Sequence, residues 1–344
     1  MKTTNFTDCY FNKSAEAAKV ANHNPRVIYQ IFQKHNAILA GIELIYPLFD
    51  KCKDATIHSM MDGDTIAPWE PVMHIEAPLA EVVSLETVYL GILARCTRVA
   101  TNVHACVKAA NGKPLLFFPA RFDVPEVQHY DGYAAHIGGA AGCSTYEQMT
   151  GFNGNATEPV GTMPHALIAA FNGDTAAASI AFAAARPKEK NWALVDFHNN
   201  CAKTAVEVYK ALADKGLHLE GVRLDTSEKL IDDGIYDKFK PGVLGLYGVC
   251  VPLVEHVRQS LNEAGAKHVK ICVSGGFNAP KITEFETAGA PVDVYAAGES
   301  TISGANPFTS DIVRVLNGLQ WANVAKIGRG FKENPAMIRW TQIK

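Results

Sequence analysis

From residue 113 onward, short apolar runs alternate with amphipathic segments, and this alternation restricts the possible folds more than any other feature. The seven apolar runs are PLLFFPAR, AAHIGGAAG, EPVGTMPH, NWALVDF, LEGVRLD, VKICVSGG and PVDVYAAG. The clearest helical segments are NNCAKTAVEVYKALADKG, SEKLIDDGIYDKF, PLVEHVRQSLNEAG and APKITEFETAG. Alternation of this kind is typical of parallel strands joined by right-handed crossovers. Seven such units are more than a half-wound sheet needs, so we predict an irregular TIM-like α/β barrel over residues 112–305.

The sequence before the barrel, residues 1–111, predicts a separate N-terminal mixed α/β domain. PVMHIEAPLAEV is typical of a strand that turns at Pro78, and VSLETVYLGILARCTRVATNVHACVKAA predicts one long helix ended by Asn111-Gly112. PRVIYQIFQ and AILAGIELIYPLF fit a helix or a strand. The tail, residues 306–344, is too short for a domain, and we expect it to pack back on the N-terminal domain.

Composition limits the classes of function. The chain has 344 residues, 48% of them hydrophobic, with a net charge of −3 and no basic tract, which argues against a dedicated nucleic-acid or membrane-surface binder. No apolar stretch resembles a signal peptide or a membrane span, and no cysteine pair forms a CxxC motif. We therefore expect a soluble cytoplasmic enzyme acting on small molecules. Several of the eight cysteines lie in apolar runs and are expected to be small core residues; the eight are Cys9, Cys52, Cys96, Cys106, Cys143, Cys201, Cys250 and Cys272.

The carboxyl ends of the predicted barrel strands carry the polar residues that a ligand site needs. Glycines, arginines, aspartates and a histidine at one rim indicate an anion site with a metal or a ribose nearby. No strand ends in lysine, which weakens the alternative of a Schiff-base aldolase. The rim residues are Arg121, Gly138, Gly139, Thr162, His165, Asp196, His198, Arg223, Asp225, Ser274, Gly275, Gly276, Gly298, Glu299 and Ser300.

His165 follows a Gly-Thr-Met-Pro run at the start of a predicted helix. Pro164 suits the first helical position, because its missing N–H would be unsatisfied there. His165 then lies near the positive end of the helix dipole, which disfavours the imidazolium and predicts a neutral, nucleophilic ring. The alternative is a buried core or capping histidine.

The other rim motifs each allow two interpretations. VSGGFN and YAAGEST can cradle a phosphate with backbone N–H groups, or simply turn the chain tightly. Arg223 and Asp225 share one face of a strand and can contact a sugar diphosphate, or form an ion pair that caps the barrel. Asp196 can orient a ribose or a metal-bound water, whereas the alternative is that Asp196 or Asn199 caps the next helix. One helix end contributes about 1–2 kcal/mol and micromolar affinity needs about 8 kcal/mol, so several donors have to converge.

Several of these segments, in this order and spacing, resemble the nicotinate phosphoribosyltransferases of the type II phosphoribosyltransferase family. They are TDCYF, IEAPLAEVVSLET, LLFFPAR through DGYAAHIGGAAGCST, PVGTMPHALI, LVDFHNN, GVRLDTS, SGGFNAPKI and VAKIGRG. The resemblance implies an N-terminal mixed α/β sandwich domain completed by the C-terminal tail, an irregular barrel, and a homodimer or larger homo-oligomer with active sites at subunit contacts. It also implies transfer of phosphoribose from phosphoribosyl pyrophosphate (PRPP) to nicotinate in NAD biosynthesis. Mg²⁺ would assist, and ATP hydrolysis is often coupled.

By the same resemblance, His165 is the residue phosphorylated by ATP, Tyr10 stacks on the pyridine ring, and Arg121 holds its carboxylate. Thr162 and Asp196 are further substrate-binding candidates, and Arg223 and Asp225 would meet the diphosphate and ribose. The residues expected around the 5′-phosphate are Ser274, Gly275, Gly276, Gly298, Glu299 and Ser300. Such a reaction passes through a cationic ribosyl centre, so the protein has to position the ring and neutralise the leaving group rather than supply a strong base.

The chain departs from the family pattern at three places. Phe122 stands where a second arginine is common, Ala297-Gly298-Glu299-Ser300 replaces Gly-Val-Gly-Thr, and RLDTSE replaces Arg-Leu-Asp-Ser-Gly-Asp. A quinolinate phosphoribosyltransferase would be expected to carry an Arg-Lys-Thr cluster, which FFPARFDVPEV lacks. Nicotinamide as substrate stays open, because one side chain can separate an amide from an acid. A barrel that binds a phosphorylated metabolite without turning it over is the alternative from another class.

Overall fold

The computed structural model describes residues 3–152, 158–236 and 245–340. The chain divides into two compact units, which are considered one at a time. Unit 1 comprises Met1–Thr101, His129–Gly138 and Ser303–Lys344, and unit 2 comprises Asn102–Gln128 and Gly139–Ile302. The first boundary therefore follows Thr101 rather than residue 111, and the last follows Ile302 rather than residue 305.

Unit 1 is built on a six-stranded antiparallel sheet with the strand order β13-β12-β1-β5-β3-β14. Residues from the C-terminal tail form three of its strands, which confirms that the tail completes the N-terminal domain. Its strands are β1 (Arg26–Phe32), β3 (Thr56–Ser59), β5 (Pro71–Pro78), β12 (Thr309–Asn317), β13 (Gln320–Asn323) and β14 (Ile338–Arg339), beside a separate pair, β2 (Ala37–Ile38) and β4 (Thr65–Ile66). Its helices are α1 (Cys9–Val20), α2 (Ile42–Ile45), α3 (Leu79–Val82) and the N-terminal part of α4 (Glu86–Ala109), with 3₁₀ turns at Thr3–Phe6, Tyr46–Phe49 and Val83–Leu85.

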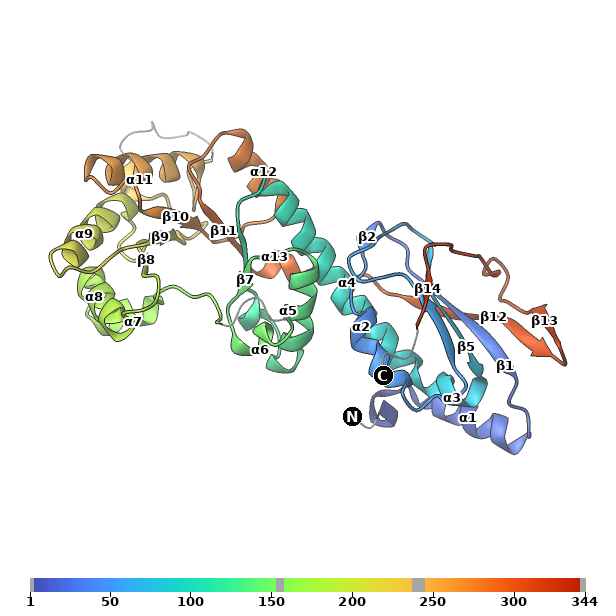
Figure 1. Cartoon of the computed structure of the whole chain (residues 1–344). Helices are drawn as coiled ribbons and strands as arrows, with labels where there is room; N and C mark the ends of the chain where they lie inside the picture. Colours follow the sequence, from blue (N-terminus) through green and yellow to red (C-terminus); the bar gives the residue numbers. More distant parts are fainter. Residues whose placement is uncertain (1–2, 153–157, 237–244, 341–344) are drawn as a thin grey trace. The chain divides into compact units, whose positions relative to one another are not determined.

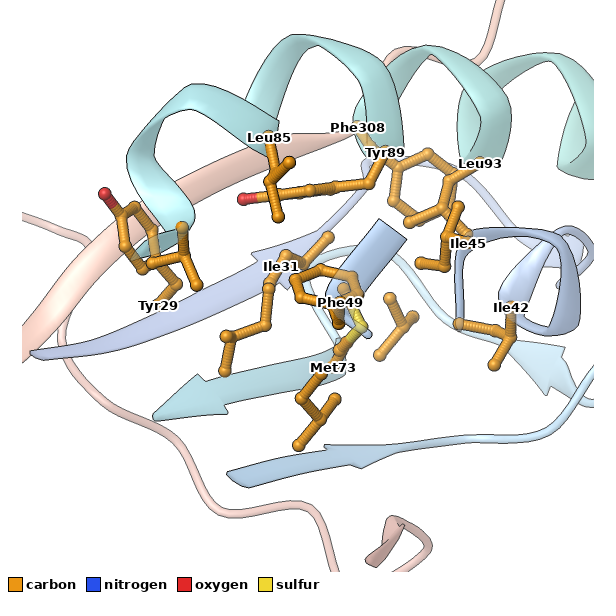
Figure 2. Close-up of a cluster of buried hydrophobic side chains, with 14 of the residues drawn as sticks. Tyr29, Ile31, Ile42, Ile45, Phe49, Met73, Leu85, Tyr89, Leu93 and Phe308 are labelled. Atoms are coloured by element: carbon orange, nitrogen blue, oxygen red, sulfur yellow. The ribbon is translucent and has the colours of Figure 1, made fainter. Parts of the chain in front are cut away.

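Figure 2 shows how α4 covers this sheet. Leu85, Tyr89 and Leu93 follow one another at intervals of four residues, so they share one face at the start of the helix, and all three are buried. They pack over Ile31 of β1 and Met73 of β5. Complete burial of one such side chain stabilises the fold by about 1.5–3 kcal/mol. The long helix predicted from the sequence is confirmed; it ends at Ala109, just before Asn111 and Gly112, which both have positive φ.

Helix α5 (Gln128–Ile137) belongs mostly to unit 1 because two of its residues are tied there. Arg95 forms a bidentate pair with Asp131, with N–O distances of 2.7 and 2.9 Å. The Tyr133 hydroxyl donates to the Asp62 carboxylate at 2.6 Å. The expected strand AAHIGGAAG is therefore largely the end of this helix and the turn after it, and only its last residue, Gly142, pairs as a strand, together with Cys143.

Unit 2 contains a six-stranded sheet, all of it parallel, with the order β7-β6-β11-β10-β9-β8. Its curled strands, with helices packed outside them, confirm the predicted irregular barrel (Figure 1). Its strands are β6 (Leu115–Phe117), β7 (Gly142–Cys143), β8 (Trp192–Leu194), β9 (Gly221–Leu224), β10 (Lys270–Val273) and β11 (Val294–Ala297). Its helices are α6 (Tyr146–Met149), α7 (His165–Ala170), α8 (Thr175–Ala185), α9 (Cys201–Ala213), α10 (Asp233–Tyr236), α11 (Val251–Glu263), α12 (Ala279–Thr287) and α13 (Glu299–Ile302), with 3₁₀ turns at Ala120–Phe122 and Pro125–Val127.

The expected strand EPVGTMPH is wrong, because this segment only bridges the two edge strands of the sheet. The N–H of Val160 donates to the carbonyl of Cys143 on β7 at 2.8 Å, and the N–H of Met163 donates to the carbonyl of Trp192 on β8 at 3.4 Å. Its two prolines have no N–H to give to a ladder, so the segment cannot pair regularly. The barrel is incomplete at this point.

The expected helix SEKLIDDGIYDKF is also mostly wrong. Only α10, a single turn, forms in its described part, and residues 237–244 lie outside the described residues. Asp232 explains the difference, because its buried carboxylate accepts the N–H groups of Cys201 and Gly234, each at 2.9 Å. These bonds hold the chain before α10 against the start of α9.

The cysteines behave as expected from their apolar surroundings. All eight are free thiols, seven are buried, and Cys9 is exposed. Among the described residues, no helix combines the length and the apolar character needed to cross a bilayer.

Candidate active site

The parallel register of unit 2 brings the carboxyl ends of five strands to one edge. Arg223 on β9 lies beside Leu194 of β8 and Cys272 of β10, while Phe117 of β6 lies beside Ala297 of β11. The residues that follow these strands therefore meet at that edge, as the barrel prediction requires. They include Arg121, Asp196, Arg223, Asp225, Ser274, Gly275, Gly276, Gly298, Glu299 and Ser300.

His165 is the first residue of α7 and faces a carboxylate. Pro164 was expected at the first helical position, but it is the N-cap, one residue before the helix begins. The Nε2 atom of His165 lies 3.0 and 3.1 Å from the two carboxylate oxygens of Asp196. The Asp196 side chain is 8% exposed and that of His165 is 44% exposed.

The hydrogen bond to Asp196 raises the pKa of His165, and the charge of the same carboxylate acts in the same direction, against desolvation. Asp196 therefore opposes the predicted effect of the helix end, which was to favour the neutral ring. A full carboxylate charge at hydrogen-bond distance outweighs the partial charge at the end of a six-residue helix.

Arg223, Asp225 and Ser274 form the second part of the site. The Nη2 atom of Arg223 lies 3.5 Å from an Asp225 oxygen, and the Ser274 hydroxyl donates to the other Asp225 oxygen at 2.7 Å. Ser274 is buried, and the Nε atom of Arg223 is buried with no hydrogen-bond partner in the described part of the chain. The pair is loose enough to leave guanidinium N–H groups for a ligand. The charges of Asp225 and Arg223 also act on the pKa of His165, so the two parts of the site adjoin.

Two glycines shape the turn after β10. Gly275 and Gly276 have φ of +86° and +67°, a conformation that other residues adopt only with strain. Successive N–H groups in such a turn make a concave anion-binding surface. The turn is tied to α13, because the Ser300 hydroxyl donates to the carbonyl of Phe277 at 2.7 Å.

Phe122, which stands where a second arginine is common in the family, crowds the turn after β11. A Cβ on Gly298 would lie 3.0 Å from the ring of Phe122 and 3.3 Å from the carbonyl oxygen of Phe118. The Arg121 guanidinium lies 5.5 Å from the centre of the Phe122 ring. Phe122 therefore occupies space beside Gly298, and Glu299 is the first residue of the one-turn helix α13.

The two remaining predicted residues differ in placement. Thr162, in the segment that bridges β7 and β8, has a buried hydroxyl oxygen with no hydrogen-bond partner among the described residues. Tyr10 is exposed on α1 in unit 1, and its hydroxyl donates to Asp8 at 3.2 Å. Its proposed stacking on a pyridine ring stays a prediction.

Sequence reasoning missed residues that support the site. The cap of α9 is Asn200, whose side chain accepts the N–H of Lys203 at 3.2 Å, so neither Asp196 nor Asn199 caps that helix. Asn199 instead donates to the carbonyl of Ile231 and to Asp233, each at 2.9 Å. Asn199 has a φ of +53°, and this backbone conformation accompanies its contacts with Ile231 and Asp233. The sequence around an asparagine does not reveal a positive φ, so this role could not be predicted.

Magnesium has no dedicated cage in the part of the chain described here, where no group of three or more His, Cys, Asp or Glu side chains is arranged to hold a metal. The carboxylates of Asp196 and Asp225 nevertheless lie at the site edge. Mg²⁺ is commonly held by one or two carboxylates together with substrate phosphates, and the residues fit that arrangement.

Comparison with known proteins agrees with this architecture. Residues 8–97 match the family model for the quinolinate phosphoribosyl transferase N-terminal domain. Nicotinate phosphoribosyltransferase pncB1 of Mycobacterium tuberculosis is 28% identical over 285 residues, covering 81% of this chain and 57% of that protein. Nicotinate phosphoribosyltransferase of Bacillus subtilis is 28% identical over 253 residues, covering 72% of this chain and 45% of that protein. The chain thus spans about half the length of the curated relatives it matches.

The solved structure of nicotinate-nucleotide pyrophosphorylase from Pyrococcus furiosus is 29% identical and covers 95% of this chain and 78% of its own, with a TM-score of 0.80. The chain is thus similar in both sequence and fold to enzymes named as nicotinate phosphoribosyltransferase and nicotinate-nucleotide pyrophosphorylase. Human nicotinic acid phosphoribosyltransferase, at 18% identity and a TM-score of 0.69, shares the type II phosphoribosyltransferase fold over 90% of this chain and 75% of its own.

Proposed function

We propose that this chain transfers phosphoribose from PRPP to nicotinate, giving nicotinate mononucleotide and pyrophosphate in NAD biosynthesis. The observation that carries the proposal is the cluster at the edge of the parallel sheet, which comprises His165, Asp196, Arg223, Asp225 and Ser274. The two similar proteins named nicotinate phosphoribosyltransferase, which cover 81% and 72% of this chain, support the same substrate.

The cluster suits a reaction in which bonds to a ribosyl centre break before new ones are complete. The guanidinium of Arg223 can neutralise charge on the departing diphosphate, and the Asp225 carboxylate can stabilise the cationic sugar. The turn at Gly275 and Gly276 can hold the 5′-phosphate and so fix the ribose in line with the base. None of these steps needs a strong general base.

ATP coupling would use His165. A neutral ring that donates its Nε2–H to Asp196 carries its lone pair on Nδ1, which makes Nδ1 the candidate nucleophile. A bond forms between Nδ1 and the γ-phosphorus of ATP as the bond to the β–γ bridging oxygen breaks, and ADP leaves with that electron pair. The Asp196 carboxylate then stabilises the positive ring. In this proposal the enzyme is a ligase-type, ATP-stimulated pentosyltransferase.

The proposal includes Mg²⁺, a homodimer or larger homo-oligomer, and a cytoplasmic location. The metal would be held mainly by the diphosphate of PRPP, with Asp225 and Asp196 as the nearest carboxylates, and it would supply charge neutralisation. Tyr10 and Arg121 are the proposed contacts to nicotinate.

Quinolinate is the second candidate substrate, favoured by the family model that matches residues 8–97. Quinolinate carries two carboxylates, so its binding site needs two basic side chains to pair with them. In the segment 114–128, between the start of β6 and the start of α5, Arg121 is the one basic residue, which favours a mono-acid.

The test is release of pyrophosphate from PRPP and Mg²⁺ with nicotinate, nicotinamide or quinolinate, each with and without ATP. We expect turnover with nicotinate, stimulation by ATP, and loss of that stimulation in His165→Ala. Turnover with quinolinate alone would establish the second candidate. Absence of pyrophosphate release with all three bases would refute the proposed reaction.

A further inference from the structure

The carboxylate of Glu228 lies directly against the glycine turn of the phosphate site. Its Oε1 atom occupies the place from which a side chain on Gly276 would project, so no Cβ fits there unless Glu228 moves. This contact comes from the loop after β9, where RLDTSE departs from the family pattern. An acidic group thus touches the surface proposed to receive a phosphate.

The backbone of Glu228 is held from the other side. A Cβ on Gly248 would lie 3.2 Å from the Glu228 Cα, and the N–H of Gly248 donates to the carbonyl of Leu230 at 2.8 Å. Ile231 and Tyr247 pair in an isolated antiparallel bridge. The backbone near Glu228 is therefore packed against Tyr247 and Gly248, and rotation of the Glu228 side chain is the movement that we expect to take its carboxylate away from Gly276.

Lys281 reaches the same turn from α12. It is partly buried, its ammonium donates to the carbonyl of Gly275 at 3.3 Å, and it lies 4.5 Å from the centre of the Phe277 ring. Burial lowers the pKa of Lys281, and the charges of Glu228 and Glu284 oppose that effect. Glu228 therefore supplies part of the negative charge that stabilises this ammonium.

A phosphate monoester entering the turn would bring a second negative group to Gly276. Two anions cannot share that surface without strong repulsion, whereas phosphate and Lys281 attract each other. We infer that Glu228 is a displaceable occupant of the phosphate cradle, which a sugar 5-phosphate must push away from Gly276 before it pairs with Lys281. This inference rests on the proposed function, in which the cradle receives the 5′-phosphate of PRPP. It makes Glu228 and Lys281 determinants of sugar-phosphate affinity.

The test is calorimetric titration of the full chain with ribose 5-phosphate, which needs no turnover. Removing the competing charge in Glu228→Gln should tighten binding by about five-fold, because one screened unit charge no longer opposes the phosphate. Lys281→Met should weaken binding by about ten-fold. Glu284→Gln is the matched control, since it removes another carboxylate that acts on Lys281 but does not touch Gly276, and it should leave the affinity within about two-fold of wild type.

Unchanged or weaker binding by a folded Glu228→Gln protein would overturn the inference, as would a wild-type chain that does not bind ribose 5-phosphate. If Glu228→Gln does not fold, Lys281→Met tests the inference alone. An unchanged affinity of Lys281→Met for ribose 5-phosphate would refute the pairing of the phosphate with Lys281. In turnover assays, Glu228→Gln should lower KM for PRPP. A wild-type chain that binds ribose 5-phosphate but releases no pyrophosphate would refute the proposed reaction and leave this inference standing.

Discussion

Replacing Asp196 by asparagine tests the electrostatic account of His165. The change keeps the size of the side chain but removes the charge that lies 3.0 Å from Nε2. Because Asp196 raises the pKa of His165, the imidazolium should become less stable in Asp196→Asn. The folded protein should then bind a proton at His165 less readily than wild type does.

The geometry sets the size of the effect. A hydrogen bond to a charged group contributes about 1.5–3 kcal/mol when both partners are buried. Asp196 meets that condition with 8% exposure, but the His165 side chain is 44% exposed, so solvent screens the pair. We therefore expect a contribution of about 1 kcal/mol to the free energy of unfolding.

The sign of the pH dependence follows from linkage. A histidine whose pKa is raised by folding contributes stability below its unfolded-state pKa of about 6.5, and that contribution is lost as the pH rises through the folded-state pKa. The wild type should thus exceed Asp196→Asn in urea stability at about pH 5.5, and the difference should shrink by about pH 9.

Proton NMR titration of the imidazole checks the cause directly, with His165→Gln used to assign the resonance. We expect the wild-type ring to titrate at a higher pH than the ring in Asp196→Asn. An equal or lower midpoint in the wild type would show that the helix end, not Asp196, controls the ring.

Two further predictions concern the site and the core. Ser274→Ala removes the hydroxyl that donates to Asp225. Loss of one such hydrogen bond costs about 1 kcal/mol, so KM for PRPP should rise by about five-fold. A KM within about two-fold of wild type would count against the positioning of Asp225 by this hydroxyl. Leu93→Ala should destabilise unit 1 by about 2–5 kcal/mol in urea unfolding, because Leu93 is completely buried on the face of α4 that covers the sheet. Leu90→Ala, a partly buried neighbour on the same helix, should cost clearly less, and equal losses would contradict the packing in Figure 2.

The features predicted well from sequence are those that depend on periodicity over many residues. The apolar spacing of α4 and the alternation of strands and helices from β8 to β11 require only that apolar faces be buried, and they were confirmed. The local pattern of PRVIYQIFQ fits a helix or a strand equally. In the structure it is the strand β1, because it forms hydrogen bonds with β5 on one side and β12 on the other. Such pairing joins residues that are distant in the sequence, so no local pattern contains it.

The parts that were missed depend on a few polar atoms. His165 was assigned a neutral ring from its helix position, whereas Asp196, 31 residues later, controls it. Glu228 entered the sequence analysis only as the last residue of RLDTSE, and its contact with Gly276 appears only when β9 and β10 lie side by side. The sequence therefore located the rim of the site but not the electrostatics within it.

The incomplete barrel has a mechanical consequence for His165. In the described part of the chain, the segment before this histidine is joined to β7 and β8 by one backbone hydrogen bond on each side, those of Val160 and Met163. Local opening is least costly where few backbone bonds must break. In the proposed ATP-coupled reaction, His165 approaches a nucleotide in one step and withdraws from it in the next, and the segment that carries it is held to the sheet by only these two backbone bonds among the described residues.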